Sequence, residues 1–140
     1  MIKEASTNLE IEKCFPVMKQ LRPNIEEASF VETVRKLNEE GYVLVYLEEN
    51  SEIKAVAGFK EQHNLVLGKH LYVEDLVTDE KARSKGHGQK LFKWLCDRGK
   101  QKQCSVIHLD SGTQRHAAHK FYLTQNMQIF CYHFIKELNP

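Results

Sequence analysis

A glycine-rich turn surrounded by cationic side chains stands near the middle of the chain, in the stretch DEKARSKGHGQKLFKWL (residues 79–95). Gly86 and Gly88 come just before an apolar-periodic segment, and Arg83 and Lys85 precede them. Such a turn at the start of a helix exposes backbone N–H groups at the positive end of the helix dipole, where phosphates bind. Glycine allows close approach of an anion, and the cations can add charge-assisted contacts. The pattern therefore predicts a compact polyanionic ligand.

Two common phosphate-binding motifs do not match this turn. The P-loop needs GxxxxGK followed by Ser or Thr, and GHGQKL lacks this arrangement. The dinucleotide pattern GxGxxG also fails, because Leu91 stands where its third glycine would be. The preceding strand is moreover predicted to belong to an antiparallel meander, and a dinucleotide site needs a doubly wound parallel sheet. The ligand is therefore expected to be of another phosphate-bearing class.

The basic face around the turn raises nucleic acid as a rival ligand. Eight Lys or Arg residues and one acid, Asp97, lie between Lys81 and Lys102, although the whole chain carries a net charge of only +1. A protein that used this face on DNA or RNA would bind with a steep salt dependence. The isoelectric point of about 7.7 is low for such a domain, so we expect no nucleic-acid partner.

The elements that position the turn follow from hydrophobic periodicity and turn residues. The first half predicts a short strand at residues 1–5, a helix from Asn8 interrupted by a kink or restart at Pro16, and a helix at 25–40 that ends at Gly41. Three strands at 42–49, 53–62 and 71–78 are too closely spaced for helical crossovers, so they form an antiparallel meander.

The second half predicts a βαβ unit followed by a final helix and strand. Helix 86–98 connects strand 71–78 to a parallel strand at 105–111 by a right-handed crossover. Ser111 and Gln114 form a capping-box pattern for a helix that reaches Leu123, and a last strand covers 128–137. The expected fold is a single α/β domain over residues 1–140, with a mixed, mostly antiparallel sheet of six or seven strands flanked by about four helices.

The spacing Arg83-x-x-Gly86-x-Gly88 after VEDLVTDEKA, with SVIHLDS and AAHKFYLTQNM downstream, resembles the GNAT (GCN5-related) N-acetyltransferase superfamily. The resemblance covers essentially the whole chain in order of elements, and the specific motifs span residues 73–127. It implies an acyl-CoA acyltransferase fold with acetyl-CoA as cosubstrate. The turn would hold the CoA pyrophosphate, and the strand before it would pair with the pantetheine amides like an added strand. The cofactor-binding residues so implied are Leu76, Val77, Thr78, Arg83, Ser84, Lys85, Gly86, His87, Gly88 and Gln89.

The resemblance also implies a general acid and a general base. Tyr122 of the matching Phe-Tyr pair would protonate the leaving thiolate, since a phenol keeps its proton at neutral pH. Glu74, nine residues before Arg83, matches a glutamate that takes the amine proton in some members of the family. Its neighbour Asp75 should point to the opposite face of a regular strand, so only one of the two is expected to reach the cleft. Whether Glu74, Asp75 or a water chain acts as base is left open at this point.

One position departs from the family pattern, because Arg115 stands where an Asn usually precedes the helix Ala118 by three residues. The segment RHAAHKFY and the later YHF are similar to small-molecule amine acetyltransferases, and their cationic, His-rich rim would suit an acidic acceptor. His116, His119 and His133 lack a carboxylate or Cys at matching spacing, so no metal site is expected.

The predicted activity is direct transfer of the acetyl group from acetyl-CoA to a primary amine, with a small molecule as the expected acceptor. The alternatives are a non-catalytic acyl-CoA-binding sensor and a protein N-terminal or lysine acetyltransferase. A homodimer is common in the family. Lacking a signal sequence or an apolar run long enough to span a membrane, the chain is expected to be cytoplasmic and without a membrane partner. The cysteines should be reduced and buried; they are Cys14, Cys96, Cys104 and Cys131.

Overall fold

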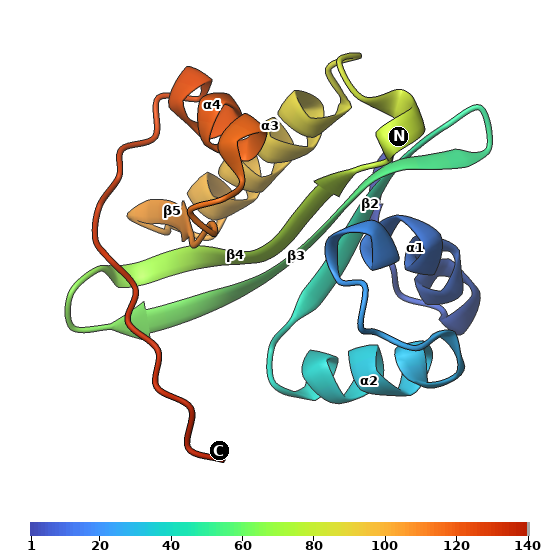
Figure 1. Ribbon diagram of the computed structural model, residues 1–140, viewed down its shortest axis with the longest axis horizontal. Coiled ribbons are helices and arrows are strands. Elements are labelled where there is room, and N and C mark those ends of the chain that lie inside the picture. The colour runs from blue at the N-terminus through green and yellow to red at the C-terminus, as the bar shows by residue number, and fades with distance from the viewer. Residues whose placement is uncertain (140) are drawn as a thin grey trace. The chain divides into compact units, whose positions relative to one another are not determined.

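The computed structural model describes residues 1–139, which form two compact units (Figure 1). The first unit spans Met1–Leu109, and the second begins at Asp110. The single-domain organisation expected from the sequence stays a prediction. No helix within the described residues is long and apolar enough to cross a membrane.

The first unit contains one mixed sheet in the order β1-β2-β3-β4-β5. The first four strands pair antiparallel, and β5 pairs parallel with β4. This arrangement confirms the predicted meander and the βαβ unit. The strands are β1 (Ile2–Glu4), β2 (Val43–Glu49), β3 (Glu52–Asn64), β4 (Gly68–Thr78) and β5 (Val106–Leu109).

Helices cover both faces of this sheet (Figure 1). On one face, α1 (Asn8–Leu21) and α2 (Glu27–Glu39) enclose a core that includes Val56 of β3 and Val77 of β4. On the other face, α3 (His87–Gln101) packs against β3 and β4, with Trp94 in edge contact with Phe59. A 3-10 turn, η1 (Glu80–Ala82), leads from β4 toward α3.

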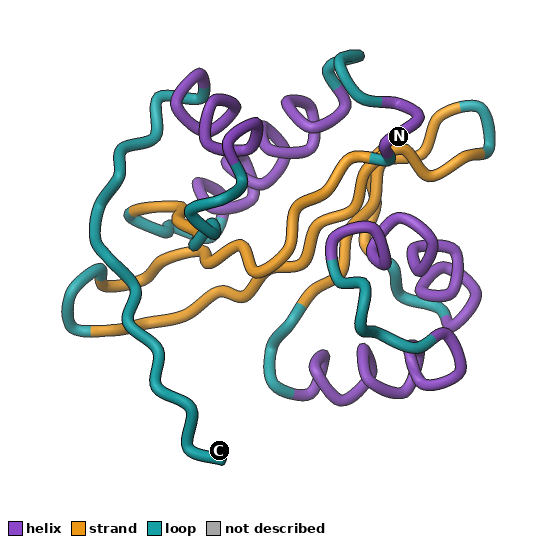
Figure 2. The backbone as a smooth tube through the Cα atoms, in the orientation of Figure 1, coloured by secondary structure: helices purple, strands orange, loops and turns teal. Residues whose placement is uncertain are grey.

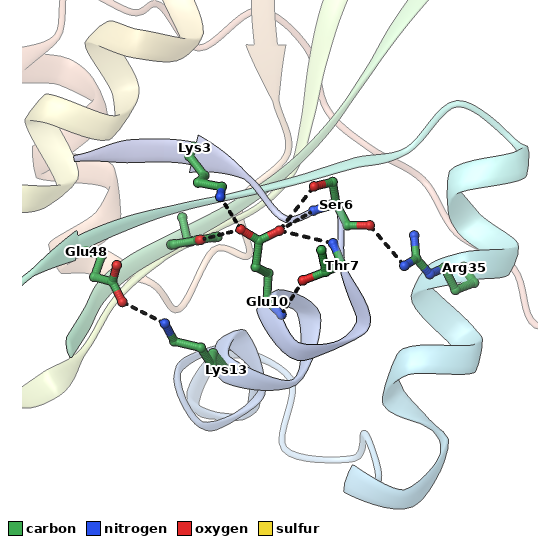
Figure 3. Close-up of polar contacts among 8 residues, drawn as sticks. Lys3, Ser6, Thr7, Glu10, Lys13, Arg35 and Glu48 are labelled. Atoms are coloured by element: carbon green, nitrogen blue, oxygen red, sulfur yellow. Dashed lines mark hydrogen bonds and ion pairs between the residues drawn. The ribbon is translucent and has the colours of Figure 1, made fainter. Parts of the chain in front are cut away.

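The start of α1 is anchored to the sheet by Glu10 (Figure 3). Thr7 is the N-cap, and it forms a capping box with Glu10. The carboxylate of Glu10 accepts hydrogen bonds from the backbone N–H groups of Ser6 and Thr7 and from the Tyr46 hydroxyl, and it pairs with Lys3. The Lys3 contact is the main reason that the pKa of Glu10 lies far below its usual value. A restart at Pro16 is wrong, since α1 continues through this residue as one helix, and the alternative of a kink stays a prediction.

The turns that flank β2 use the left-handed backbone region. Gly41 ends α2 with φ +95°, as the helix C-terminal signal predicted. Asn50 and Ser51, with φ of 54° and 64°, join β2 to β3. Positive φ at both central residues matches the twist of an antiparallel hairpin, which explains why this short turn closes the strand pair.

The second unit corrects three expectations. Its helix, α4 (His116–Thr124), begins after the predicted Ser111, and Arg115 precedes it without a side-chain cap. The predicted last strand at 128–137 is wrong, since no strand is assigned beyond β5 in the described chain (Figure 2). A segment forms a β-strand only if it has a pairing partner as well as alternating apolar residues. The sheet of the described residues therefore has five strands instead of six or seven. The expected burial of the cysteines holds for Cys14, whereas Cys96 and Cys104 are partly exposed and Cys131 is exposed.

Candidate active site

The glycine-rich turn leads into the start of α3 with an uncapped helix end. Gly86 is the N-cap residue with φ +81°, and no side chain caps the helix. The first intrahelical bond of this end is donated by Lys90 to Gly86, so the N–H groups of residues 87–89 have no intrahelical acceptor. Arg83 and Lys85 are exposed beside them. The turn therefore fits an anion as the sequence predicted.

His87 ties this turn to the end of β2. Its buried imidazole has Nδ1 at 3.3 Å from the Ala82 carbonyl oxygen and Nε2 at 3.3 Å from Oε2 of Glu49, which is also 3.7 Å from the Lys90 ammonium. Partial burial alone would raise the pKa of Glu49, but His87 and Lys90 outweigh it and hold that pKa below its usual value. His87 thus has a packing role, which the sequence did not indicate.

Changing Gly86 to alanine should weaken acetyl-CoA binding about tenfold. An added Cβ meets no protein atom within 4 Å, so the change costs only the strain of φ +81°, about 1 kcal/mol, while the methyl group occupies space beside the free N–H groups. Gly41→Ala is the matched control, because φ there is +95° with equally open space. Titration calorimetry should find the affinity unchanged in Gly41→Ala; an equal loss in both variants would contradict a role of the turn in binding.

The strand before the turn loses its parallel neighbour partway along. Pairing of β4 with β5 ends at Val73 opposite Leu109, whereas pairing with β3 continues to Thr78 opposite Ala55. Beyond Val73, alternate residues of β4 direct their backbone groups away from β3. Leu76, Val77 and Thr78 lie in this segment, which offers edge groups of the kind that an amide-bearing chain can pair with.

A β-bulge at Glu74 changes where its side chain and that of Asp75 lie. Asp75 pairs with Gly58 and Val73 with Phe59, so Glu74 is the extra residue. The ring of Phe59 packs against Trp94 of α3, so the next residue, Lys60, lies on the opposite face of the sheet, the face of α1 and α2. Glu74 lies on this face too, because its Oε1 is 3.9 Å from Nζ of Lys60.

Asp75 lies on this same face. Its Oδ2 accepts a 2.7 Å hydrogen bond from the hydroxyl of Tyr42, which belongs to the core under α1 and α2. The expectation that Glu74 and Asp75 point to opposite faces is therefore wrong, because the bulge breaks the alternation that it assumed.

The environment of Glu74 favours a carboxyl group that binds a proton readily. Burial is the main cause of a pKa above the usual value; the ammonium of Lys60 opposes this shift, and the charge of Asp75 adds to it. A general base works best with a pKa close to the working pH, so the upward direction suits the role predicted for Glu74.

Asp75 is held by two partners, Arg22 and Tyr42, from separate parts of the chain. Arg22, just after α1, donates from Nε to Asp75 Oδ1 at 2.8 Å and from a terminal nitrogen to the Glu74 carbonyl oxygen at 2.8 Å. Tyr42 passes over Gly58, where an added Cβ would lie 1.7 Å from its hydroxyl oxygen. The hydrogen bond from Arg22 to the Glu74 carbonyl oxygen stabilises the bulge. Arg22 and Tyr42 were not predicted from the sequence, in which a glycine inside the strand AVAGFK was the available signal of close approach.

A pocket of about 350 Å³ opens next to this network. Both α1 and α2 contribute to its walls, and Tyr42 and Asp75 form part of its lining. Its volume falls in the range of small-molecule sites. Because Glu74 is the bulged neighbour of Asp75 on this face, the pocket lies beside the predicted base.

Tyr122 belongs to α4 in the second unit. Burial raises the pKa of its phenol above the usual value, and the charge of Arg115 partly offsets this shift. The hydroxyl therefore keeps its proton at neutral pH, as a general acid must. In the same unit, His119 Nε2 lies 2.7 Å from the Gly112 carbonyl oxygen, and His133 Nδ1 lies 3.8 Å from Asp110.

Comparison with known proteins decides the family. The model of the acetyltransferase (GNAT) family matches residues 7–127. The chain belongs to this family. It is also 31% identical over 122 residues to the uncharacterized N-acetyltransferase YhdJ of Bacillus subtilis (strain 168), covering 86% of each protein. Membership makes this acetyltransferase an acetyl-CoA-dependent enzyme, which confirms the predicted family, activity class and cosubstrate.

Solved structures share the fold of this acetyltransferase at low sequence identity. A transcriptional regulator from Bacillus halodurans C-125 superposes with a TM-score of 0.85 at 21% identity, covering 99% of both chains. The aminoglycoside N-acetyltransferase AAC(6')-Iy in complex with CoA reaches a TM-score of 0.87 at 13% identity, covering 100% of this chain and 95% of the other.

Proposed function

We propose that this acetyltransferase moves the acetyl group of acetyl-CoA directly onto a small primary amine, with Glu74 as general base and Tyr122 as general acid. The observation that carries this proposal is the bulge, which puts the half-buried Glu74 on the face that holds the pocket. The pocket size supports a small molecule over a protein N-terminus or lysine as acceptor.

The cosubstrate contacts proposed for this chain come from two segments. The N–H groups and cations of Arg83, Ser84, Lys85, Gly86, His87, Gly88 and Gln89 would hold the pyrophosphate, and Leu76, Val77 and Thr78 would pair with the pantetheine amides. Two observations support them, the uncapped start of α3 and the end of β4–β5 pairing at Val73.

The proposed chemistry needs two proton movements. Acetyl-CoA supplies an acetyl thioester, whose carbonyl carbon bonds to the amine nitrogen as its C–S bond breaks. Glu74 accepts the proton that the amine nitrogen must lose, directly or through water, and its raised pKa helps it to hold that proton. Tyr122 donates its proton to the leaving sulfur, and its own raised pKa keeps that proton available.

Calorimetric titration of the full-length protein with acetyl-CoA tests the binding half of this proposal. A thiol-release assay against a panel of small amines then tests transfer. Saturable binding with thiol release on at least one small amine is the expected result. Release only with peptide acceptors would contradict the small-molecule proposal, and binding with no release on any acceptor would favour the sensor alternative.

Replacing Tyr122 by phenylalanine should lower kcat by about 10²-fold with little change in acetyl-CoA affinity. Only the proton donor is removed, while the ring is kept. The measurement is steady-state thiol release together with calorimetric affinity, and Tyr132→Phe, at an exposed position, is the control. Unchanged kcat in Tyr122→Phe would contradict its role as acid.

A further inference from the structure

The pocket beside Glu74 has both apolar and polar lining residues. Its apolar walls come from α1, α2 and the segment between them, and include Met18, Ile25, Phe30, Val34 and Leu37. Phe30 and Val34 are core residues, 6% and 3% exposed, so they form firm walls. Asp75 and Tyr42, joined by a 2.7 Å hydrogen bond, belong to the polar lining together with Asn24, Glu26, Ser29 and Thr33. An occupant would therefore bury most of its body against hydrocarbon.

The charges that line this pocket leave no cation for an anionic group. Among its lining residues, Arg22 carries the only positive charge, against the carboxylates of Asp75 and Glu26. Arg22 is committed by 2.8 Å hydrogen bonds to Asp75 and to the Glu74 carbonyl oxygen. A carboxylate or phosphate brought here would face these carboxylates and lose water without a replacement partner. A protonated amine, in contrast, is attracted by them.

We infer that the acceptor is an alkyl or arylalkyl amine with an apolar body and no anionic group. This inference rests on the proposed function and names its acceptor class. At about 350 Å³ the pocket falls in the range of small-molecule sites, and a ring-substituted benzylamine is of suitable size for it. It also replaces the expectation of an acidic acceptor, which was drawn from the His-rich segment around α4.

A matched pair of acceptors tests this inference. 4-Methylbenzylamine and 4-(aminomethyl)benzoate have the same shape and differ mainly in a carboxylate distant from the amine. With the full-length enzyme at saturating acetyl-CoA, kcat/KM for thiol release should be at least about tenfold higher for 4-methylbenzylamine, because the carboxylate of the benzoate would lose water in the pocket without a free cation as partner. Equal or higher kcat/KM for the benzoate would overturn the inference.

Two variants connect this preference to the pocket. Thr33 is an exposed residue that lines the pocket, so Thr33→Trp should fill it without disturbing the core and raise KM for 4-methylbenzylamine about tenfold. Glu32→Trp, an exposed neighbour that does not line the pocket, should leave KM unchanged. Asp75→Asn removes the carboxylate that pairs with Arg22, so it should reduce the difference in kcat/KM between the two acceptors. Equal KM in Thr33→Trp and Glu32→Trp would overturn the placement of the acceptor.

Direct binding separates this inference from the proposed function. Calorimetry on the Glu74→Gln variant with CoA present should detect binding of 4-methylbenzylamine. The same variant should bind 4-(aminomethyl)benzoate at least about tenfold more weakly. If this binding preference is found but the unchanged enzyme acetylates neither amine, the inferred ligand class of the pocket is supported and the transferase proposal is contradicted. If the unchanged enzyme acetylates anionic amines and shows no binding preference, the transferase proposal is supported and the inferred acceptor class is overturned.

Discussion

Replacing Glu74 by glutamine lowers kcat by about 10²- to 10³-fold, the usual contribution of a positioned general base. The amide keeps the size of the side chain on the pocket face but cannot accept a proton from the amine. Acetyl-CoA affinity stays the same, since the proposed cosubstrate contacts lie elsewhere. The measurement is thiol release at saturating acetyl-CoA with a reactive amine. A loss below about threefold would mean that Glu74 is not the base.

The pH profile of the unchanged enzyme gives a second test of the same residue. The base must be deprotonated, so kcat falls as the pH decreases through the raised pKa of Glu74, and this limb lies above the range of an ordinary glutamate. The Lys60 ammonium holds this pKa down, so Lys60→Gln should move the acidic limb to higher pH. Glu40 raises it slightly, so Glu40→Gln should move the limb slightly lower. A limb that stays in place in both variants would assign the titration to another group.

Changing Gly58 to alanine destabilises the protein by about 3 kcal/mol, or about 10 °C in Tm. The new Cβ would lie 1.7 Å from the hydroxyl oxygen of Tyr42 and 2.5 Å or less from two of its ring carbons, so the whole ring must move. That movement breaks the hydrogen bond to Asp75, leaving a carboxylate oxygen without its donor. Thermal and urea unfolding measure the loss, and activity should fall with it.

A matched glycine and a double variant separate this clash from a general effect of alanine. Gly99 lies inside α3, and a Cβ there meets its nearest atoms, from Cys104 and Leu71, at 3.8 Å. Gly99→Ala should therefore be neutral or stabilising by up to about 1 kcal/mol, because alanine favours a helix. In a Tyr42→Ala background, Gly58→Ala should cost less than 1 kcal/mol, since the ring is gone. Equal costs in both backgrounds would show that Tyr42 is not the obstacle.

Local patterns in the sequence were sufficient for most of the fold. Alternating residues at 42–49 and 53–62, the turn at Asn50 and Ser51, and the helical spacing after Gly88 each encode an element within a few residues of chain. The structure confirms the meander, the parallel β4–β5 pair and the four helices. The segment at 128–137 has an equally good strand pattern but no strand, because a strand also requires a neighbour that its own residues do not specify.

The family and the turn at Arg83–Gly88 can be recognised from the amino-acid sequence alone, because glycine positions and cation spacing are fixed by the chemistry of one short loop. The arrangement around the predicted base depends instead on tertiary contacts. The bulge at Glu74 depends on the register between β3 and β4, and Arg22 and Tyr42 reach Asp75 from positions 53 and 33 residues away in the sequence. Hydrophobic periodicity specifies which face of an element is buried, but long-range packing specifies which side chains share that face.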